Sequence, residues 1–156
     1  METIKFRGKR FDNGEWVEGD LVTDCDANLN INKLYIHNRI SGVPKFNGNC
    51  MGSIITLAEV DPATVGQFIG VMDEADSQEL FNGDIIKIVY FEEPFRCEIK
   101  HEGSGYILIS EGFPGGFIWV SDYLHFEDGA CWIIGSEKIG NIYDNPELLA
   151  RRDGDG

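Results

Sequence analysis

The sequence is short of cysteine, histidine and positive charge, and each shortage argues against a class of function. Its 156 residues hold four cysteines and no Cys-x-x-Cys pair, which argues against a zinc site and against a disulfide scaffold. Only 13 Lys and Arg stand against 27 Asp and Glu, giving a formal net charge of −14. Nucleic acids and anionic membranes attract cationic surfaces, so we expect neither as a partner.

A long apolar run, a signal peptide and a catalytic signature are also missing. We therefore expect no membrane span, a cytoplasmic location and reduced thiols. The three histidines have no motif spacing, and the glycine-rich stretch at 112–117 lacks both the Walker lysine and a following helix. Pairs such as Cys97 with His101 carry no family signature. The sequence therefore predicts no enzymatic activity and no cofactor.

What the chain does contain is a series of short apolar segments separated by turn residues, typical of a mainly β (β-rich α+β) fold. The strand candidates lie at 4–7, 16–22, 34–37, 54–57, 65–70, 85–91, 96–100, 106–110, 117–120, 132–134 and 138–143. Their spacing in the second half predicts a small barrel-like (SH3-like) sheet. We expect a single domain over 1–156, with a possible division into 1–70 and 71–150 and a flexible tail at 151–156.

The first two strand candidates predict an N-terminal β-hairpin around Asp12–Gly14. Asn-Gly favours a two-residue type I′ turn, in which both positions need a positive φ. Alternation along the strands is expected to separate apolar from basic side chains. The apolar set is Ile4, Phe6 and Trp16, and the basic set is Lys5, Arg7 and Lys9.

Residues 24–53 are rich in Asn and predict an irregular excursion, longer than compact domains usually carry. Asp24, Asp26 and Asn28 begin like a calcium-binding loop. However, Leu29 stands where such a loop needs Gly, and Tyr35 stands where it needs a bidentate Glu. A polar-faced strand or turn explains the same pattern, so both interpretations stay open.

The ending Gly-Asn-Ile-Tyr-Asp-Asn-Pro-Glu-Leu-Leu raises the question of whether it is a reactive site or a closing element of the fold. Asn145 suits a helix N-cap, Pro146 suits the first helical position, and Glu147 suits the positive end of the helix dipole. Leu148 and Leu149 are placed to anchor a short C-terminal helix. Each residue therefore has a structural role, and we interpret the ending as a structural lock.

Four segments in order resemble the YopX family of phage and prophage proteins. They are 4–9 with 13–17, then 61–70, 79–86 and 139–149. Family members carry a short Asp-Lys-Asn-Gly turn where this chain has the longer, more acidic Asp73–Gln78, and the Asn-rich excursion matches nothing in the family. The resemblance implies a phage or prophage context, a bacterial host cytoplasm and a mostly β fold. It supplies no catalytic residue.

Aromatic residues around the loop at 112–117 are the candidates for a protein contact. Phe113 and Phe117, with Trp119 and Tyr123, form either part of the core or an exposed patch. We take Phe113 and Phe117 as the contact candidates.

The resulting hypothesis is a phage or prophage accessory protein that acts through protein–protein contacts or self-association. One alternative is a nucleic-acid-associated regulator or enzyme that uses the basic residues Lys5, Arg7, Lys9 and Arg10. A second alternative is a module that binds a divalent cation or small ligand at Asp24–Asn32.

Overall fold

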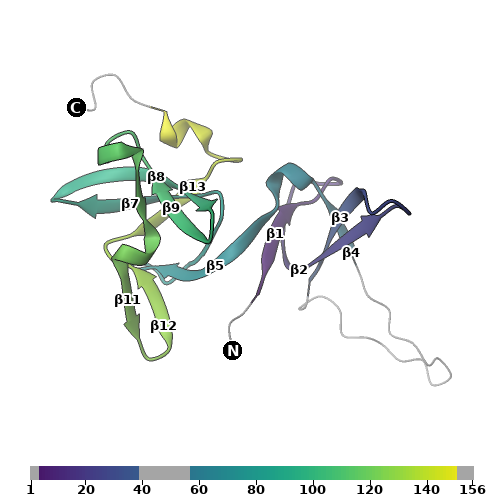
Figure 1. The fold of residues 1–156 in the computed structure, drawn as a ribbon, viewed down its shortest axis with the longest axis horizontal. Coiled ribbons are helices and arrows are strands. Elements are labelled where there is room, and N and C mark those ends of the chain that lie inside the picture. Colours follow the sequence, from purple (N-terminus) through teal and green to yellow (C-terminus); the bar gives the residue numbers. More distant parts are fainter. Residues whose placement is uncertain (1–3, 39–56, 151–156) are drawn as a thin grey trace. The chain divides into compact units, whose positions relative to one another are not determined.

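The computed structural model describes residues 4–38 and 57–150 and confirms a mainly β fold with open sheets (Figure 1). The chain divides into two compact units, Met1–Gln67 and Phe68–Gly156. Part of the predicted excursion, at 39–53, and the predicted tail at 151–156 lie outside the described residues. Barrel-like closure of the C-terminal half remains a prediction.

The first unit is an antiparallel sheet in the order β5-β1-β2-β3-β4. Its elements are β1 (Phe6–Lys9), β2 (Trp16–Cys25), β3 (Ile31–His37), β4 (Leu57–Val60), the 3₁₀ turn η1 (Pro62–Thr64) and the start of β5 (Gly66–Asp73). Val17, Ile36 and Val60 are its buried core. Gly8 leaves the space that Val60 fills, because a Cβ on Gly8 would lie 3.0 Å from Val60 Cβ. The strand predicted at 34–37 is confirmed, because β3 covers Ile31–His37.

The first hairpin forms as predicted, but the prediction of a two-residue type I′ turn is wrong. Arg10 N donates to Glu15 O at 2.9 Å, which leaves a four-residue loop. Only Gly14 in that loop has a positive φ, of 72°. Asn13 instead accepts a hydrogen bond from Glu15 N through its side chain.

The predicted faces of this hairpin also need correction. Trp16 pairs with Lys9, so it lies on the face of the basic residues and opposite Phe6. Arg7 is only 4% exposed, and its guanidinium carbon lies 4.7 Å from the centre of the Trp16 ring. Stacking on an aromatic face suits the planar, weakly hydrated guanidinium, so the arginine is part of the packed structure.

The second unit holds an antiparallel sheet in the order β10-β9-β8-β7-β13. In the chain, β11 and β12 fall between β10 and β13 and form an antiparallel hairpin, and β12 pairs in parallel with β5. The elements are β6 (Glu79–Phe81), β7 (Asp84–Tyr90), β8 (Glu93–Glu102), β9 (Gly105–Ile109), η2 (Pro114–Gly116), β10 (Phe117–Trp119), η3 (Val120–Tyr123), β11 (Leu124–Glu127), β12 (Ala130–Ile133), β13 (Glu137–Asn141) and η4 (Pro146–Leu149). Ile86, Ile88, Cys97, Ile99 and Leu108 form the centre of its core.

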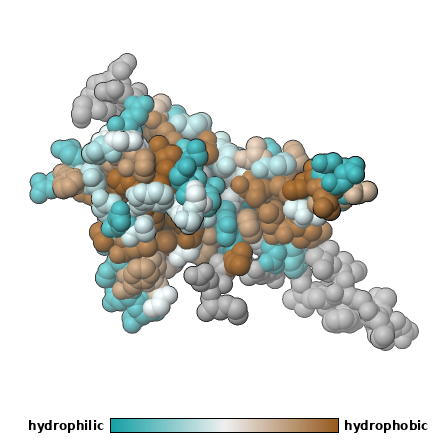
Figure 2. Space-filling model, in the orientation of Figure 1, coloured by the Kyte–Doolittle hydropathy of each residue, from teal (hydrophilic) through white to brown (hydrophobic). Residues whose placement is uncertain are grey.

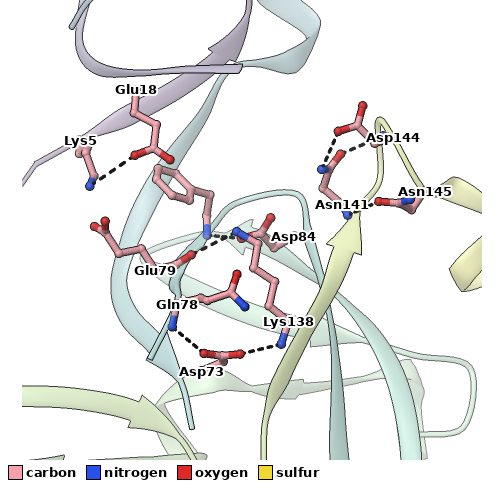
Figure 3. Close-up of polar contacts among 11 residues, drawn as sticks. Lys5, Glu18, Asp73, Gln78, Glu79, Asp84, Lys138, Asn141, Asp144 and Asn145 are labelled. Atoms are coloured by element: carbon pink, nitrogen blue, oxygen red, sulfur yellow. Dashed lines mark hydrogen bonds and ion pairs between the residues drawn. The ribbon is translucent and has the colours of Figure 1, made fainter. Parts of the chain in front are cut away.

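The chain ending is a turn held by side chains (Figure 3). Asn141 Oδ1 accepts hydrogen bonds from Tyr143 N at 3.0 Å and Asp144 N at 2.9 Å, and Asn145 Oδ1 accepts one from Asn141 N at 3.3 Å. The predicted strand stops at Asn141, and the predicted helix is the single 3₁₀ turn η4. The Asn145 side chain makes no capping bond to that turn. These contacts give the motif a structural role, as the lock interpretation expects.

Candidate protein-contact surface

The two contact candidates occupy different environments. Phe113 is 3% exposed and packs in the core, with its ring centre 5.2 Å from that of Tyr90 and 5.1 Å from that of Phe95. Phe117 is 42% exposed. Phe113 is therefore a core residue, and only Phe117 is available at the surface.

Burial of Phe113 holds the loop that leads to Phe117. Gly112 allows this burial, because a Cβ on Gly112 would lie 2.2 Å from the Phe95 ring. Phe113 N donates to Ser110 O at 3.1 Å, and Gly116 N donates to Phe113 O at 2.9 Å. The loop is thus fixed at both its centre and its end before the chain enters β10.

β10 is a short edge strand with aromatic side chains on one face. Among the described strands it pairs only with β9. Phe117 and Trp119 are two residues apart, so they share a face; their ring centres are 6.0 Å apart and their planes nearly perpendicular. Trp119 is 40% exposed and also covers Gly105, where a Cβ would lie 3.4 Å from the ring.

Buried residues anchor β10 at both ends. Phe113 precedes the strand and Val120, which is 5% exposed, follows it. Because the strand is fixed in this way, little conformational entropy remains to be lost when it contacts another molecule. Over the unit Phe68–Gly156, hydrophobic side chains reach the surface between hydrophilic ones (Figure 2).

The opposite edge of the same sheet is less suited to a contact. β13 carries a register shift between Lys138 and Gly140, and such bulges discourage further strand pairing. In the other sheet, the edge strand β11 exposes Phe126 at 72%, and its exposed His125 stacks on Trp132 of the neighbouring strand β12. β10 differs in that two large hydrophobic rings of the same strand, Phe117 and Trp119, are exposed and contact each other.

The negative charge is concentrated in the unit that carries β10. Phe68–Gly156 holds eighteen of the 27 acidic residues and six of the 13 basic ones, a net of twelve negative charges. Exposed Glu111 and Asp122 lie on either side of β10 in the chain. Burial raises the pKa of Glu98 on β8, and the positive charge of Lys100 partly opposes this. Sequence reasoning missed Glu111 and Asp122, because only the position of β10 shows that they flank an edge.

The predicted cation residues form part of a hairpin turn. β2 runs through Asp24, which pairs with Lys33 of β3. The Asp26 carboxylate accepts bonds from Asn28 N at 2.8 Å, Asn30 N at 3.0 Å and Asn30 Nδ2 at 3.2 Å, which lowers its pKa. Within residues 4–38 and 57–150, no three His, Cys, Asp or Glu side chains group as metal ligands. The turn therefore accounts for the Asp-Asn pattern.

The basic residues near the start are largely engaged within the protein. Lys5 Nζ lies 3.6 Å from Glu18 Oε2, and Arg10 binds both carboxylate oxygens of Asp12. Arg7 is buried, as described above. This arrangement gives a nucleic-acid backbone little unbalanced positive charge to bind.

The most deeply buried polar residues of the second unit hold its turns together (Figure 3). Asp73 accepts from Gln78 N at 2.7 Å and Lys138 N at 2.9 Å. Asp84 accepts from Phe81 N at 2.7 Å and lies 3.2 Å from Lys138 Nζ. Both carboxylates are fully buried, so solvent and substrates have no access to them. No helix in the described part of the chain has the length and apolarity to cross a membrane.

Comparison with known proteins identifies the family. The solved crystal structure of protein EF1440 from Enterococcus faecalis has a similar fold, with a TM-score of 0.57 and 22% sequence identity. That match covers 96% of this chain and 100% of the other. No curated protein matches the chain. The family model described as YopX protein matches residues 5–150, which include every strand above. The chain therefore belongs to the YopX family, as its sequence motifs indicate.

Proposed function

We propose that this YopX-family protein is a phage or prophage accessory protein that acts in the host cytoplasm, without catalysis, by binding another protein through β10. The observation that carries this proposal is the exposed pair Phe117 and Trp119 on an edge strand anchored by buried Phe113 and Val120. Aromatic side chains that are rigidly held and partly exposed are typical of the centres of protein interfaces.

A different protein fits this surface better than a second copy of the chain. Two copies would bring two units with twelve negative charges each into contact, and like charges across an interface oppose association. The alternatives at the basic face and at Asp24–Asn32 have less support, because intramolecular contacts engage their charged groups.

The test compares capture of proteins from host lysate by the purified chain and two matched variants. Phe117→Asp and Phe126→Asp each replace an exposed Phe on an edge strand with a negative charge. Phe117 lies on β10, and Phe126 lies on β11 of the other sheet and serves as the control. A partner retained by wild type and Phe126→Asp, and lost with Phe117→Asp, supports the proposal. Equal capture by both variants contradicts it.

Light scattering on the same samples distinguishes self-association. We expect the wild-type chain to be a monomer in moderate salt. An oligomer that Phe117→Asp dissociates would assign β10 to contacts between copies and would overturn the choice of a different protein.

A further inference from the structure

The proposed contact at β10 can be refined to the chemistry of its partner, and this refinement rests on the proposed function. We propose that the partner docks an extended segment rich in Lys or Arg, which pairs with β10 as an additional strand of the sheet. The three observations that support this are the hydrogen-bonding edge of β10, the alternation of its aromatic residues and the distribution of charge around it.

The backbone of β10 presents an edge suited to strand pairing. Ser110 N donates to Gly116 O at 3.0 Å, so Gly116 and Ser110 form a bonded pair. The next pair along the two strands is Phe117 with Ile109. Bonded and non-bonded pairs alternate along antiparallel strands, so the bonded pair after this one is Ile118 with Leu108. The N–H groups of Phe117 and Trp119 therefore point away from β9. An extended segment can bind these groups by strand addition.

The aromatic side chains favour particular residues at alternate positions of the docked segment. Phe117 and Trp119 lie on one face of β10, and every second side chain of an added strand projects on that face. Lys and Arg pack their methylene groups on aromatic rings and hold the cation over a ring face. The length of β10, three residues, limits the paired core of the segment to about 10 Å at roughly 3.4 Å per residue.

The charges around β10 favour a basic segment over an acidic one. Glu111 and Asp122 are exposed on either side of the strand in the chain. Several basic side chains of this unit are engaged elsewhere: Lys87 with Glu137 at 3.5 Å, Arg96 with Leu148 O at 3.5 Å, and Lys138 with Asp84 at 3.2 Å. A segment that carries positive charge is therefore attracted to this edge, whereas an acidic segment is repelled.

The test uses defined peptides with the full-length chain. The probes are fluorescein-labelled eight-residue peptides of alternating lysine and valine, or of alternating glutamate and valine. We expect the lysine peptide to bind, with an affinity that falls as salt rises, and the glutamate peptide to show no binding. Lysine peptides N-methylated at every second residue, in either phase, separate strand pairing from simple charge attraction. One phase removes the donors that face β10 and should abolish binding, whereas the other should retain it.

Amide hydrogen exchange locates the bound peptide. We expect the amides of Phe117 and Trp119 to become protected when the lysine peptide binds, while the already bonded amide of Ile118 stays unchanged. Phe117→Ala should lose this protection because it removes half of the aromatic face without adding charge, and Phe126→Ala should retain it. The double variant Glu111→Gln, Asp122→Asn should weaken binding and reduce its dependence on salt. Both residues are exposed, so the melting temperature of that variant should match that of the wild type.

The outcomes separate this inference from the proposed function. Capture of a partner that depends on Phe117, without protection of the Phe117 and Trp119 amides by the lysine peptide, would overturn strand addition and leave the proposed function standing. Equal binding of the two peptides would overturn the preference for basic segments. Equal binding of the two N-methylated peptides would overturn strand pairing and leave only charge attraction.

Discussion

Replacing Phe113 or Phe117 with Ala tests the division between a buried and an exposed aromatic residue. Complete burial of a Phe side chain contributes about 2–3 kcal/mol, and the cavity left by its removal raises the cost to about 3–5 kcal/mol. Phe113 is 3% exposed and contacts two other rings, so Phe113→Ala should lower the free energy of unfolding by about 3–5 kcal/mol. Phe117 is 42% exposed and its removal leaves no closed cavity, so Phe117→Ala should cost about 1 kcal/mol.

Urea denaturation followed by tryptophan fluorescence measures both free energies in the unit concerned. A Trp16→Phe background leaves Trp119 and Trp132 as the fluorescent tryptophans, and both lie in the unit Phe68–Gly156. The slope of unfolding free energy against urea should be unchanged, so that the midpoints report stability. Phe113→Leu, which keeps most of the volume, should recover much of the loss. Equal costs for Phe113→Ala and Phe117→Ala would refute the assignment of one ring to the core and the other to the surface.

Three further predictions concern charge and close packing in the same unit. Lys138→Met removes the cation beside the fully buried carboxylate of Asp84 and should lower the free energy of unfolding, measured by urea denaturation, by about 3 kcal/mol. Lys87→Met, which breaks an exposed ion pair, should change that free energy by less than about 1 kcal/mol. Equal effects of the two substitutions would contradict this prediction. The raised pKa of Glu98 means that the folded protein binds its proton more tightly than the unfolded chain does, so stability from this group falls as pH rises from below about 4 towards 7. Glu98→Gln should therefore raise the melting temperature at pH 7 and leave it unchanged below pH 4, and a gain of the same size at both pH values would count against the burial effect. Gly140→Ala should be destabilising because its Cβ would lie 2.4 Å from Asn145 Oδ1. In an Asn145→Ala background, Gly140→Ala should lower the melting temperature by less, and an equal decrease in both backgrounds would show that the two positions are independent.

Most strands, though not β6 or β11, could be predicted from the sequence because β-branched and aromatic residues mark them locally. The segments predicted at 85–91 and 106–110 are β7 and β9, and each observed strand begins and ends one residue earlier than predicted. Each is a run of apolar residues next to a turn that contains Gly, and tertiary packing does not oppose these local preferences.

Turn types could not be predicted in the same way. The Asn-Gly sequence that suggests a type I′ turn lies in a four-residue loop, whereas Phe91 and Glu92 both adopt a positive φ, of 49° and 67°, between paired Tyr90 and Glu93. Neither residue favours that conformation. Packing of Tyr90 against Phe95 and Phe113 holds the two strands in register, so the turn adopts the conformation that the core requires.

The proposed contact surface could be predicted only in part from the sequence. Phe113 and Phe117 are both aromatic and both flank the glycine-rich loop, so local pattern does not separate them. The distinction depends on Gly112, whose missing Cβ admits the Phe95 ring and lets Phe113 enter the core. The spacing of Phe117 and Trp119, two residues apart, was the available signal that those rings share a face.

Site-specific photo-cross-linking in host cells tests the central claim most directly. One variant carries a benzophenone amino acid at position 117, on β10. A control variant carries it at position 126, which is also exposed and lies on a different edge strand, β11. The account predicts one discrete cross-linked protein from position 117, with the cross-link in a Lys- or Arg-rich segment, and no such product from position 126. Cross-linking only to a second copy of the chain, or equal products from both positions, would contradict it.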